Sequence, residues 1–157
     1  MTGESTMRIA IGSDHRGKAI KERLVRLLKQ QGHEVIDVGT HDSESVDYPD
    51  YAKRVGEEIL CRNADRGILI CGTGVGMAIA ANKLPGIRAA AVYDEVTAEM
   101  SRRHNNINVL CLPANLLSSS QLEKLVEIFL ATEFEGGRHE RRLRKIHEIE
   151  EHRPECS

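Results

Sequence analysis

The sequence predicts an α/β fold: a three-layer, doubly wound sheet of five parallel strands, followed by one C-terminal helix. Short apolar runs alternate regularly with amphipathic stretches, which is typical of a parallel sheet covered by helices on both faces. One run, RGILIC at residues 66–71, is apolar on both faces, as expected for a buried parallel strand. We expect the strand order 2-1-3-4-5.

The expected elements alternate along the whole chain. The strands cover residues 7–12, 34–38, 66–71, 87–92 and 108–112. The helices cover residues 17–31, 49–61, 77–83, 94–103, 120–131 and 138–151. This order describes a Rossmann-like unit, and such units bind their ligands at the carboxyl ends of the strands.

Particular residues mark the helix boundaries. Ile20 and Leu24 lie on one face of the first helix, at the spacing of a helix that packs on a sheet, and Gly32 ends that helix. Pro49 suits the first turn of the second helix. Asp94 is a good N-cap for the fourth helix, because its carboxylate can accept a backbone N–H.

The C-terminal helix follows a break at Gly136 and Gly137. Its apolar line of Leu143, Ile146 and Ile149 is thin, so we expect this helix to pack on a partner subunit or back on the domain. The chain then divides into a frayed extension, a Rossmann-like domain, a C-terminal helix and a tail, at residues 1–6, 7–135, 136–152 and 153–157.

Composition narrows the class of protein. Aromatic residues make up 3% and the net charge is -2, which argues against nucleic-acid and membrane-surface partners. No apolar run approaches a membrane span, and the N-terminus has no secretory signal. None of the four cysteines forms a C-x-x-C pair, so we expect neither a zinc site nor a disulfide framework, and a cytoplasmic location.

Two turns with reactive side chains leave neighbouring strands. In the expected order the first and third strands are adjacent, and the strand order reverses between them. Ser13, Asp14 and His15 follow the first strand, and the turn from Cys71 to Gly76 follows the third. We therefore expect both turns at one site.

The turn after Cys71 favours negative charge. Gly72, Gly74 and Gly76 allow several backbone N–H groups to point inward, and a helix begins there. A cysteine in this position ionises readily, and a thiolate facing amide donors suits proton abstraction next to a carbonyl. The alternative is that Cys71 is a small buried apolar residue at a strand end.

Each of the other candidate residues also has a purely structural interpretation. Asp14 and His15 could bind a sugar hydroxyl, a phosphate or a metal, or Asp14 could only cap a helix. His104 and Asn105 end the fourth helix, where a histidine can complement the helix dipole.

Arg138 and Arg142 share one face of the C-terminal helix, with His139 beside them. Guanidinium groups at this spacing suit a phosphate. The alternative is a solvated helix in which these arginines pair with Glu135 or Glu140.

Seven segments together resemble one enzyme family. They are IAIGSDHRG, VIDVGT, DYPDYA, GILICGTGVGMAIAANK, GIRAA, SRRHNNINVL and FEGGRHERR, within residues 8–151. The chain resembles the B-type ribose-5-phosphate isomerases, whose family also includes galactose-6-phosphate isomerase subunits. The resemblance implies an aldose–ketose isomerase of the non-oxidative pentose phosphate pathway, which interconverts D-ribose 5-phosphate and D-ribulose 5-phosphate through an enediolate. It implies no metal and no organic cofactor, and a homodimer or dimer of dimers with sites at the subunit interface.

The resemblance also implies a role for each matching residue. Cys71 matches the catalytic base, Thr73 part of the enediolate cradle, Asp14 a ligand of the reacting oxygens and His104 the group that opens the furanose ring. The residues that match substrate-binding positions are His15, Tyr48, Gly72, Gly74, Gly76, Asn105, Arg138 and Arg142.

Two positions depart from many relatives. Met77 stands where some members carry a catalytic Glu, which places this chain in the cysteine-using branch. Asn115 stands where many members carry an Arg, so a phosphate contact is weakened or replaced. The Asn115 position leaves open an isomerase of galactose 6-phosphate or allose 6-phosphate. A non-catalytic sugar-phosphate sensor on the same fold is a separate alternative.

Overall fold

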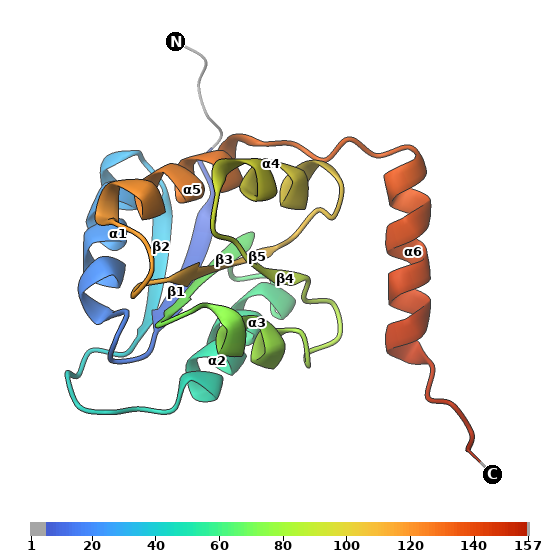
Figure 1. Ribbon diagram of the computed structural model, residues 1–157, viewed down its shortest axis with the longest axis horizontal. Helices are drawn as coiled ribbons and strands as arrows, with labels where there is room; N and C mark the ends of the chain where they lie inside the picture. The colour runs from blue at the N-terminus through green and yellow to red at the C-terminus, as the bar shows by residue number, and fades with distance from the viewer. Residues whose placement is uncertain (1–5, 157) are drawn as a thin grey trace.

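The predicted strands and helices are present in the computed structural model, which describes residues 6–156 (Figure 1). The strands are β1 (Arg8–Ser13), β2 (Glu34–Gly39), β3 (Arg66–Cys71), β4 (Ala89–Ala91) and β5 (Val109–Pro113). The helices are α1 (Lys18–Gln30), α2 (Tyr48–Leu60), α3 (Val75–Ala81), α4 (Glu95–Arg103), α5 (Ser119–Ala131) and α6 (Arg138–Glu151). Apart from Thr6, the extension expected at residues 1–6 lies outside the described residues. None of the described helices has the length and apolar character needed to cross a bilayer.

All five strands are parallel, but the predicted order of the last two is wrong. The order is β2-β1-β3-β5-β4, so β5 rather than β4 pairs with β3. β5 is buried along its whole length, whereas the three alanines of β4 are only half-buried. A short, half-exposed strand suits the sheet edge, and a fully buried strand suits the interior.

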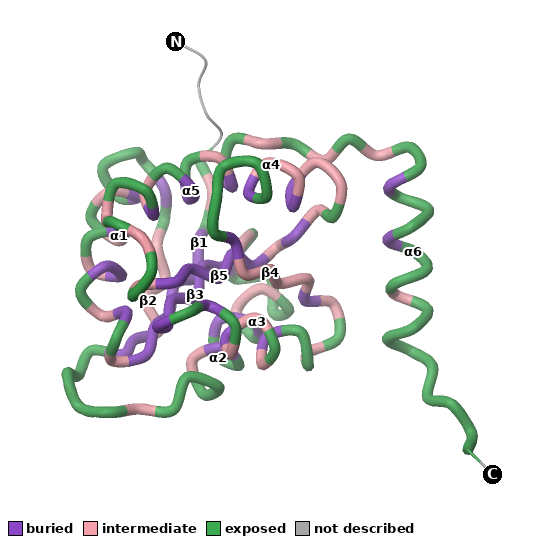
Figure 2. The backbone as a smooth tube through the Cα atoms, viewed as in Figure 1, coloured by how far each residue is buried: buried purple, intermediate pink, exposed green. Residues whose placement is uncertain are grey.

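Two apolar layers cover the sheet and confirm the three-layer architecture. Helices α1, α4 and α5 pack on one face, around residues such as Ile11, Ile68 and Phe129. Helices α2 and α3 pack on the other face, which includes Leu69 and Cys71. Figure 2 shows the buried residues concentrated along the strands between these layers. Each fully buried Ile or Leu contributes about 1.5–3 kcal/mol through removal of apolar surface from water.

Helix α6 stands to one side of the domain (Figure 1). Gly137 precedes it with a φ of 58°, a conformation that favours glycine. Leu143 is buried, and the Glu150 carboxylate accepts a hydrogen bond from the Gly86 backbone N–H at 3.1 Å. Ile149 is 74% exposed. The helix therefore touches the domain at a few separate points and leaves part of its apolar line uncovered.

Candidate active site

The Cys71 thiol lies at the carboxyl end of β3 and faces the turn that follows. Its Sγ accepts a hydrogen bond from the Gly74 backbone N–H at 3.2 Å. Gly74 has a φ of 80°, which a residue with a Cβ adopts only at a cost, so glycine suits this point of the turn. Cys71 as a whole is 5% exposed, so it is buried but lines a cleft.

A cleft of about 480 Å³ brings the two predicted turns together. Its lining residues are Asp14, Arg16, Tyr48, Cys71, Gly72, Thr73, Val75, Gly76 and Ile79. The strands β1 and β3 are adjacent, with Ser13 opposite Ile70, and the Asp14 backbone N–H donates to Ile70 O at 3.1 Å. The predicted juxtaposition of Asp14 and Cys71 is therefore correct, although β4 and β5 were misplaced.

The Asp14 carboxylate holds the turn that precedes α1 and also lines the cleft, whereas the N-cap of α1 is Gly17, which has no side chain to cap it. Its Oδ1 accepts hydrogen bonds from the backbone N–H groups of Arg16 at 3.0 Å and Gly17 at 3.1 Å. Its Oδ2 accepts no hydrogen bond from the described part of the chain. One oxygen thus fixes the turn, and the other is free for a ligand in the cleft.

Two tyrosines contact the turn that follows β3. The Tyr48 ring lies against Gly76, because a Cβ added there would sit 2.6 Å from Tyr48 Cζ. The Tyr93 hydroxyl donates to Thr73 O at 2.8 Å, which ties the start of the turn to the segment before α4. Burial and the nearby cysteine Cys71 raise the pKa of Tyr93, so it stays a neutral donor. Sequence reasoning missed Tyr93, because its partner lies twenty positions away.

His15 lies beside the loop before α2. Its Nδ1 accepts a hydrogen bond from the Val46 backbone N–H at 3.2 Å. In a neutral ring this leaves the proton on Nε2, which can then donate to an anionic ligand. His15 is half-buried and does not line the Cys71 cleft directly.

The structure shows where Met77 and Asn115 lie, the two residues that depart from many relatives. Met77 lies in α3 and is fully buried in the apolar layer between the sheet and the helices α2 and α3. Asn115 follows β5, and its backbone N–H donates to Gly72 O at 3.0 Å. Its side chain also lies over Gly72, because a Cβ added there would sit 2.9 Å from Asn115 Nδ2.

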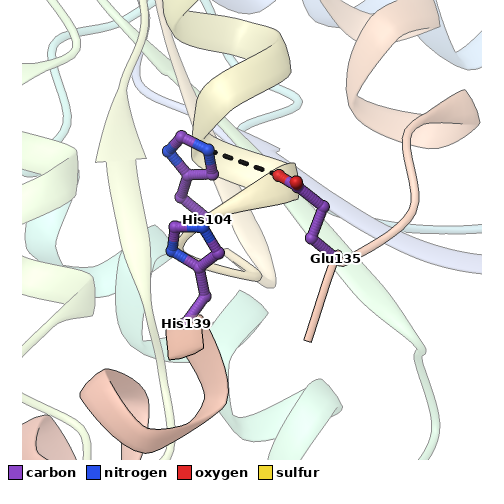
Figure 3. A group of neighbouring side chains, drawn as sticks. All are labelled: His104, Glu135 and His139. Atoms are coloured by element: carbon purple, nitrogen blue, oxygen red, sulfur yellow. Dashed lines mark ion pairs between the residues drawn. The ribbon is translucent and has the colours of Figure 1, made fainter. Parts of the chain in front are cut away.

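A second cluster of polar side chains forms around His104, Glu135 and His139 (Figure 3). The His104 Nε2 lies 3.3 Å from Glu135 Oε2. The His104 and His139 rings stack with centroids 4.1 Å apart and planes 10° from parallel. Burial lowers the pKa of His139, and the adjacent His104 and Arg138 lower it further, which favours the neutral ring. This stack places the start of α6 against the end of α4.

The histidine stack does not present a ready metal site. The nitrogen and oxygen atoms of His104, Glu135 and His139 lie within 4.8 Å of one another. The lone pairs of an imidazole lie in the plane of its ring, so two parallel rings direct them side by side rather than toward one ion. One ring would have to turn before both could bind the same metal.

The predicted phosphate ligands lie near this second cluster. Arg138 and Arg142 are exposed in the first turns of α6. Within the described chain neither guanidinium forms an ion pair, so the predicted alternative, pairing with Glu135 or Glu140, is absent there. Asn105 is also exposed and follows His104 at the end of α4.

The two clusters lie at opposite edges of the sheet. Cys71 ends β3 at the carboxyl edge, whereas α4 returns to the amino edge before β5 begins. Arg88, which precedes β4, confirms this placement, because its guanidinium donates to Asn106 O at 2.9 Å. The Cys71 cleft of the same chain is lined by no residue of the second cluster and by none of its neighbours Asn105, Arg138 and Arg142.

The fold and the cleft define a class of protein: a doubly wound α/β protein with a cysteine and a carboxylate at the switch point of its sheet, suited to moving a proton beside a carbonyl. Residues 9–146 match the family described as Ribose/Galactose Isomerase, and the chain belongs to that family.

Individual relatives cover nearly the whole chain. It is 44% identical to the ribose-5-phosphate isomerase B of Escherichia coli strain K12, over 93% of this chain and 98% of the relative. The Clostridium thermocellum ribose-5-phosphate isomerase B structure superposes with a TM-score of 0.91 at 50% identity, covering 92% of this chain and 98% of that one. The Mycoplasma genitalium ribose-5-phosphate isomerase B structure, with bound ribulose-5-phosphate, gives 0.88 at 44% identity, covering 92% and 96%.

Proposed function

We propose that this chain is an aldose–ketose isomerase that interconverts D-ribose 5-phosphate and D-ribulose 5-phosphate. The observation that carries the proposal is the Cys71 sulfur, which faces the Gly74 amide in a cleft that it shares with Asp14. Relatives at 44–50% identity carry the name ribose-5-phosphate isomerase B, and one of them holds ribulose-5-phosphate. These relatives favour the five-carbon substrate over a six-carbon sugar phosphate or a sensor.

The proposed reaction moves one proton between adjacent carbons. The Cys71 thiolate takes the proton from C2 of the open-chain aldose, and the C2 electron pair forms the enediolate as the C1 carbonyl becomes an oxyanion. The thiol then returns a proton to C1, while the O2 hydroxyl proton passes to O1 and leaves a carbonyl at C2. A positioned base of this kind typically accelerates the reaction by ~10²–10⁴-fold. This chemistry uses no oxidant and leaves the thiol in its starting state.

The remaining roles follow from the cleft. Thr73 and the amides of Gly72, Gly74 and Gly76 hold the enediolate in this proposal, and one such donor is worth ~10²–10³-fold in rate. Asp14 binds the reacting oxygens through its free Oδ2. Tyr48 forms a wall of the cleft, and His15 donates to the phosphate.

We also propose that each complete site needs two chains. One chain supplies the Cys71 cleft, and its partner supplies the ring-opening His104, with Asn105, Arg138 and Arg142. The support is the placement of these groups at opposite edges of the sheet, which keeps them apart within one chain. In this proposal residues 7–135 form the isomerase domain, residues 136–152 serve the phosphate site and the subunit contact, and the enzyme works in the cytoplasm as a dimer or a dimer of dimers.

The decisive experiment replaces Cys71. Cys71→Ala should lower turnover of ribose 5-phosphate by at least ~10²-fold, because the variant lacks the thiolate that this proposal assigns to the proton transfer. Solvent deuterium should enter the substrate in heavy water with the wild-type protein and not with this variant, while binding of ribose 5-phosphate in calorimetry should survive. Full activity of Cys71→Ala would contradict the assignment of the base. Parallel assays with galactose 6-phosphate and allose 6-phosphate test the choice of substrate. A higher kcat/KM for either sugar would show that ribose 5-phosphate is not the preferred substrate.

A further inference from the structure

Arg16 lies in the Cys71 cleft, and no role described above uses it. It follows Asp14 and His15, and its backbone N–H donates to Asp14 Oδ1 at 3.0 Å, which fixes the residue at the start of α1. Its side chain reaches across to the turn after β3. A Cβ added to Gly72 would sit 3.4 Å from Arg16 Cδ and 3.5 Å from Arg16 Nη1.

The Asn115 amide lies at the same place. Its Nδ2 would be 2.9 Å from that same Cβ on Gly72. The guanidinium of Arg16 and the amide of Asn115 therefore flank one glycine, and both carry N–H donors. Gly72 leaves room between them, because a larger residue there would fill the space that the two side chains border.

The Arg16 guanidinium is uncommitted. Across residues 6–156 it forms no side-chain hydrogen bond and no ion pair. Several other arginines of the domain are engaged: Arg8 pairs with Asp65 at 3.0 Å, and Arg102 donates to Ile107 O at 2.6 Å. A free guanidinium on an open surface is ordinary, but this one lines a cleft that also holds a carboxylate and a thiol.

A cation in the cleft would offset the negative charge that gathers there. Asp14 and a Cys71 thiolate are both negative, and a sugar phosphate brings further negative charge near them. Among the residues that line the cleft, Arg16 is the single Lys, Arg or His. A guanidinium binds a phosphate through two parallel N–H groups, and these charge-assisted hydrogen bonds are about twice as strong as neutral ones.

We propose that Arg16 is a substrate-binding residue whose guanidinium, together with the Asn115 amide, binds the phosphate of the sugar from the same chain as Cys71. This inference rests on the proposed isomerase function. It differs from the roles of Arg138 and Arg142, because those residues lie at the opposite edge of the sheet and reach the cleft only from a partner. Arg16 would thus be the cation that each cleft carries by itself.

The test measures anion binding and catalysis separately. Arg16→Gln should raise the inhibition constant of inorganic phosphate and the KM for ribose 5-phosphate by about tenfold or more, which corresponds to the loss of a charge-assisted hydrogen bond. The kcat should change by less than about threefold, because a group that binds ground state and transition state equally affects KM alone. Arg16→Lys should give an inhibition constant and a KM between those of the wild type and Arg16→Gln. Lysine keeps the positive charge but lacks the two parallel N–H donors of the guanidinium. Arg26→Gln, an exposed arginine of α1 away from the cleft, is the matched control.

A second readout separates phosphate binding from an effect on the thiol. The rate of Cys71 alkylation by iodoacetamide as a function of pH should be the same in Arg16→Gln and in the wild type. A shifted alkylation profile with an unchanged inhibition constant for phosphate would overturn the proposal and assign Arg16 to the thiolate. Unchanged phosphate inhibition with an unchanged profile would overturn it as well.

Direct calorimetry with inorganic phosphate keeps this test independent of turnover. If the wild-type protein binds phosphate and Arg16→Gln binds it at least about tenfold more weakly, Arg16 is an anion ligand even if no sugar phosphate is isomerised. If the enzyme turns over and Arg16→Gln binds phosphate as the wild type does, the isomerase function stands and this inference fails.

Discussion

Two cysteines on the same face of the sheet have different access to solvent. Cys71 ends β3 at the cleft, whereas Cys111 lies inside β5 and is fully buried. Burial raises the pKa of Cys111 far above its ordinary value, and the neighbouring Cys71 raises it further. Cys111 therefore stays a neutral thiol that packs like a small apolar side chain. Position at the strand end, more than residue type, makes Cys71 available for chemistry.

Gly17 shows how closely α1 approaches β3. A Cβ at this position would lie 2.7 Å from Ile70 Cγ2 and 2.8 Å from Ile70 O. The backbone of Gly17 has ordinary right-handed helical angles, so contact with Ile70 and not backbone strain requires the glycine. The first turn of α1 can rest on the strand only because the side chain is absent.

We therefore predict that Gly17→Ala destabilises the protein by about 1–3 kcal/mol, the usual cost of forcing extra atoms into a packed site. Urea unfolding of the variant and the wild type measures this difference. Because Gly17 also donates to Asp14 Oδ1, a shifted helix should lower activity as well. A variant with wild-type unfolding midpoint would show that α1 moves away from Ile70 freely.

At the scale of elements, the stacked histidines His104 and His139 form part of the contact between α4 and α6. His139 is 6% exposed and lies against the His104 ring, so a proton on His139 meets both burial and neighbouring positive charge. In the unfolded chain the same histidine accepts a proton near its ordinary pKa of about 6.5. The unfolded state thus binds this proton at a higher pH than the folded state does.

The predicted consequence is a loss of stability in acid. As the pH falls from neutral through about 6.5 toward the lowered pKa of His139, the unfolded state gains protons first and the free energy of unfolding decreases. His139→Phe keeps an aromatic ring for the stack and removes the titration. Melting temperatures of both proteins between about pH 7.5 and pH 5.5 should diverge, with the wild type losing more. Parallel curves would show that His139 does not contribute to the acid sensitivity.

Element existence could be predicted from local sequence, but the neighbours of β4 and β5 could not. The apolar runs and helix signals are local, and Asp94 caps α4 as predicted, accepting a hydrogen bond from the Thr97 backbone N–H at 2.7 Å. Strand order is decided by which strand fills the buried interior, and this depends on all layers at once. The expected strand at residues 87–92 also shortened to three residues, because only that part pairs with β5.

The same distinction applies to the candidate site. Asp14 and Cys71 could be placed together from sequence, because strand topology alone brings the ends of β1 and β3 to one edge. The contacts of Tyr93 with Thr73 and of Glu135 with His104 join distant segments through side chains, and no local pattern encodes them. No local pattern marks Arg16 either, because the role proposed for it depends on the side chains that surround it in the cleft.

At the scale of the whole molecule, the separated clusters make a quantitative prediction about mixed subunits. Cys71→Ala and His104→Ala should each be nearly inactive alone. In a mixed dimer, one site carries both changes and the other carries neither. Random mixing after co-refolding makes half of the dimers mixed, so about a quarter of the wild-type specific activity should return.

The control for this experiment is a mixture of two variants in the same cleft, Cys71→Ala with Asp14→Ala. Neither arrangement of these subunits makes an intact site, so no activity should return. If the mixture with His104→Ala also stays inactive while the subunits exchange, the two-chain site is wrong.

The position of the functional groups at opposite edges of the sheet has a consequence for the enzyme at low abundance. If each site needs two chains, as proposed, a lone folded chain with its thiol, carboxylate and arginine in place would have no activity. Dilution would then stop turnover without melting a single helix, and specific activity would rise with concentration until the chains pair. The amount of this protein in a cell would set how fast each molecule works as well as how many molecules there are.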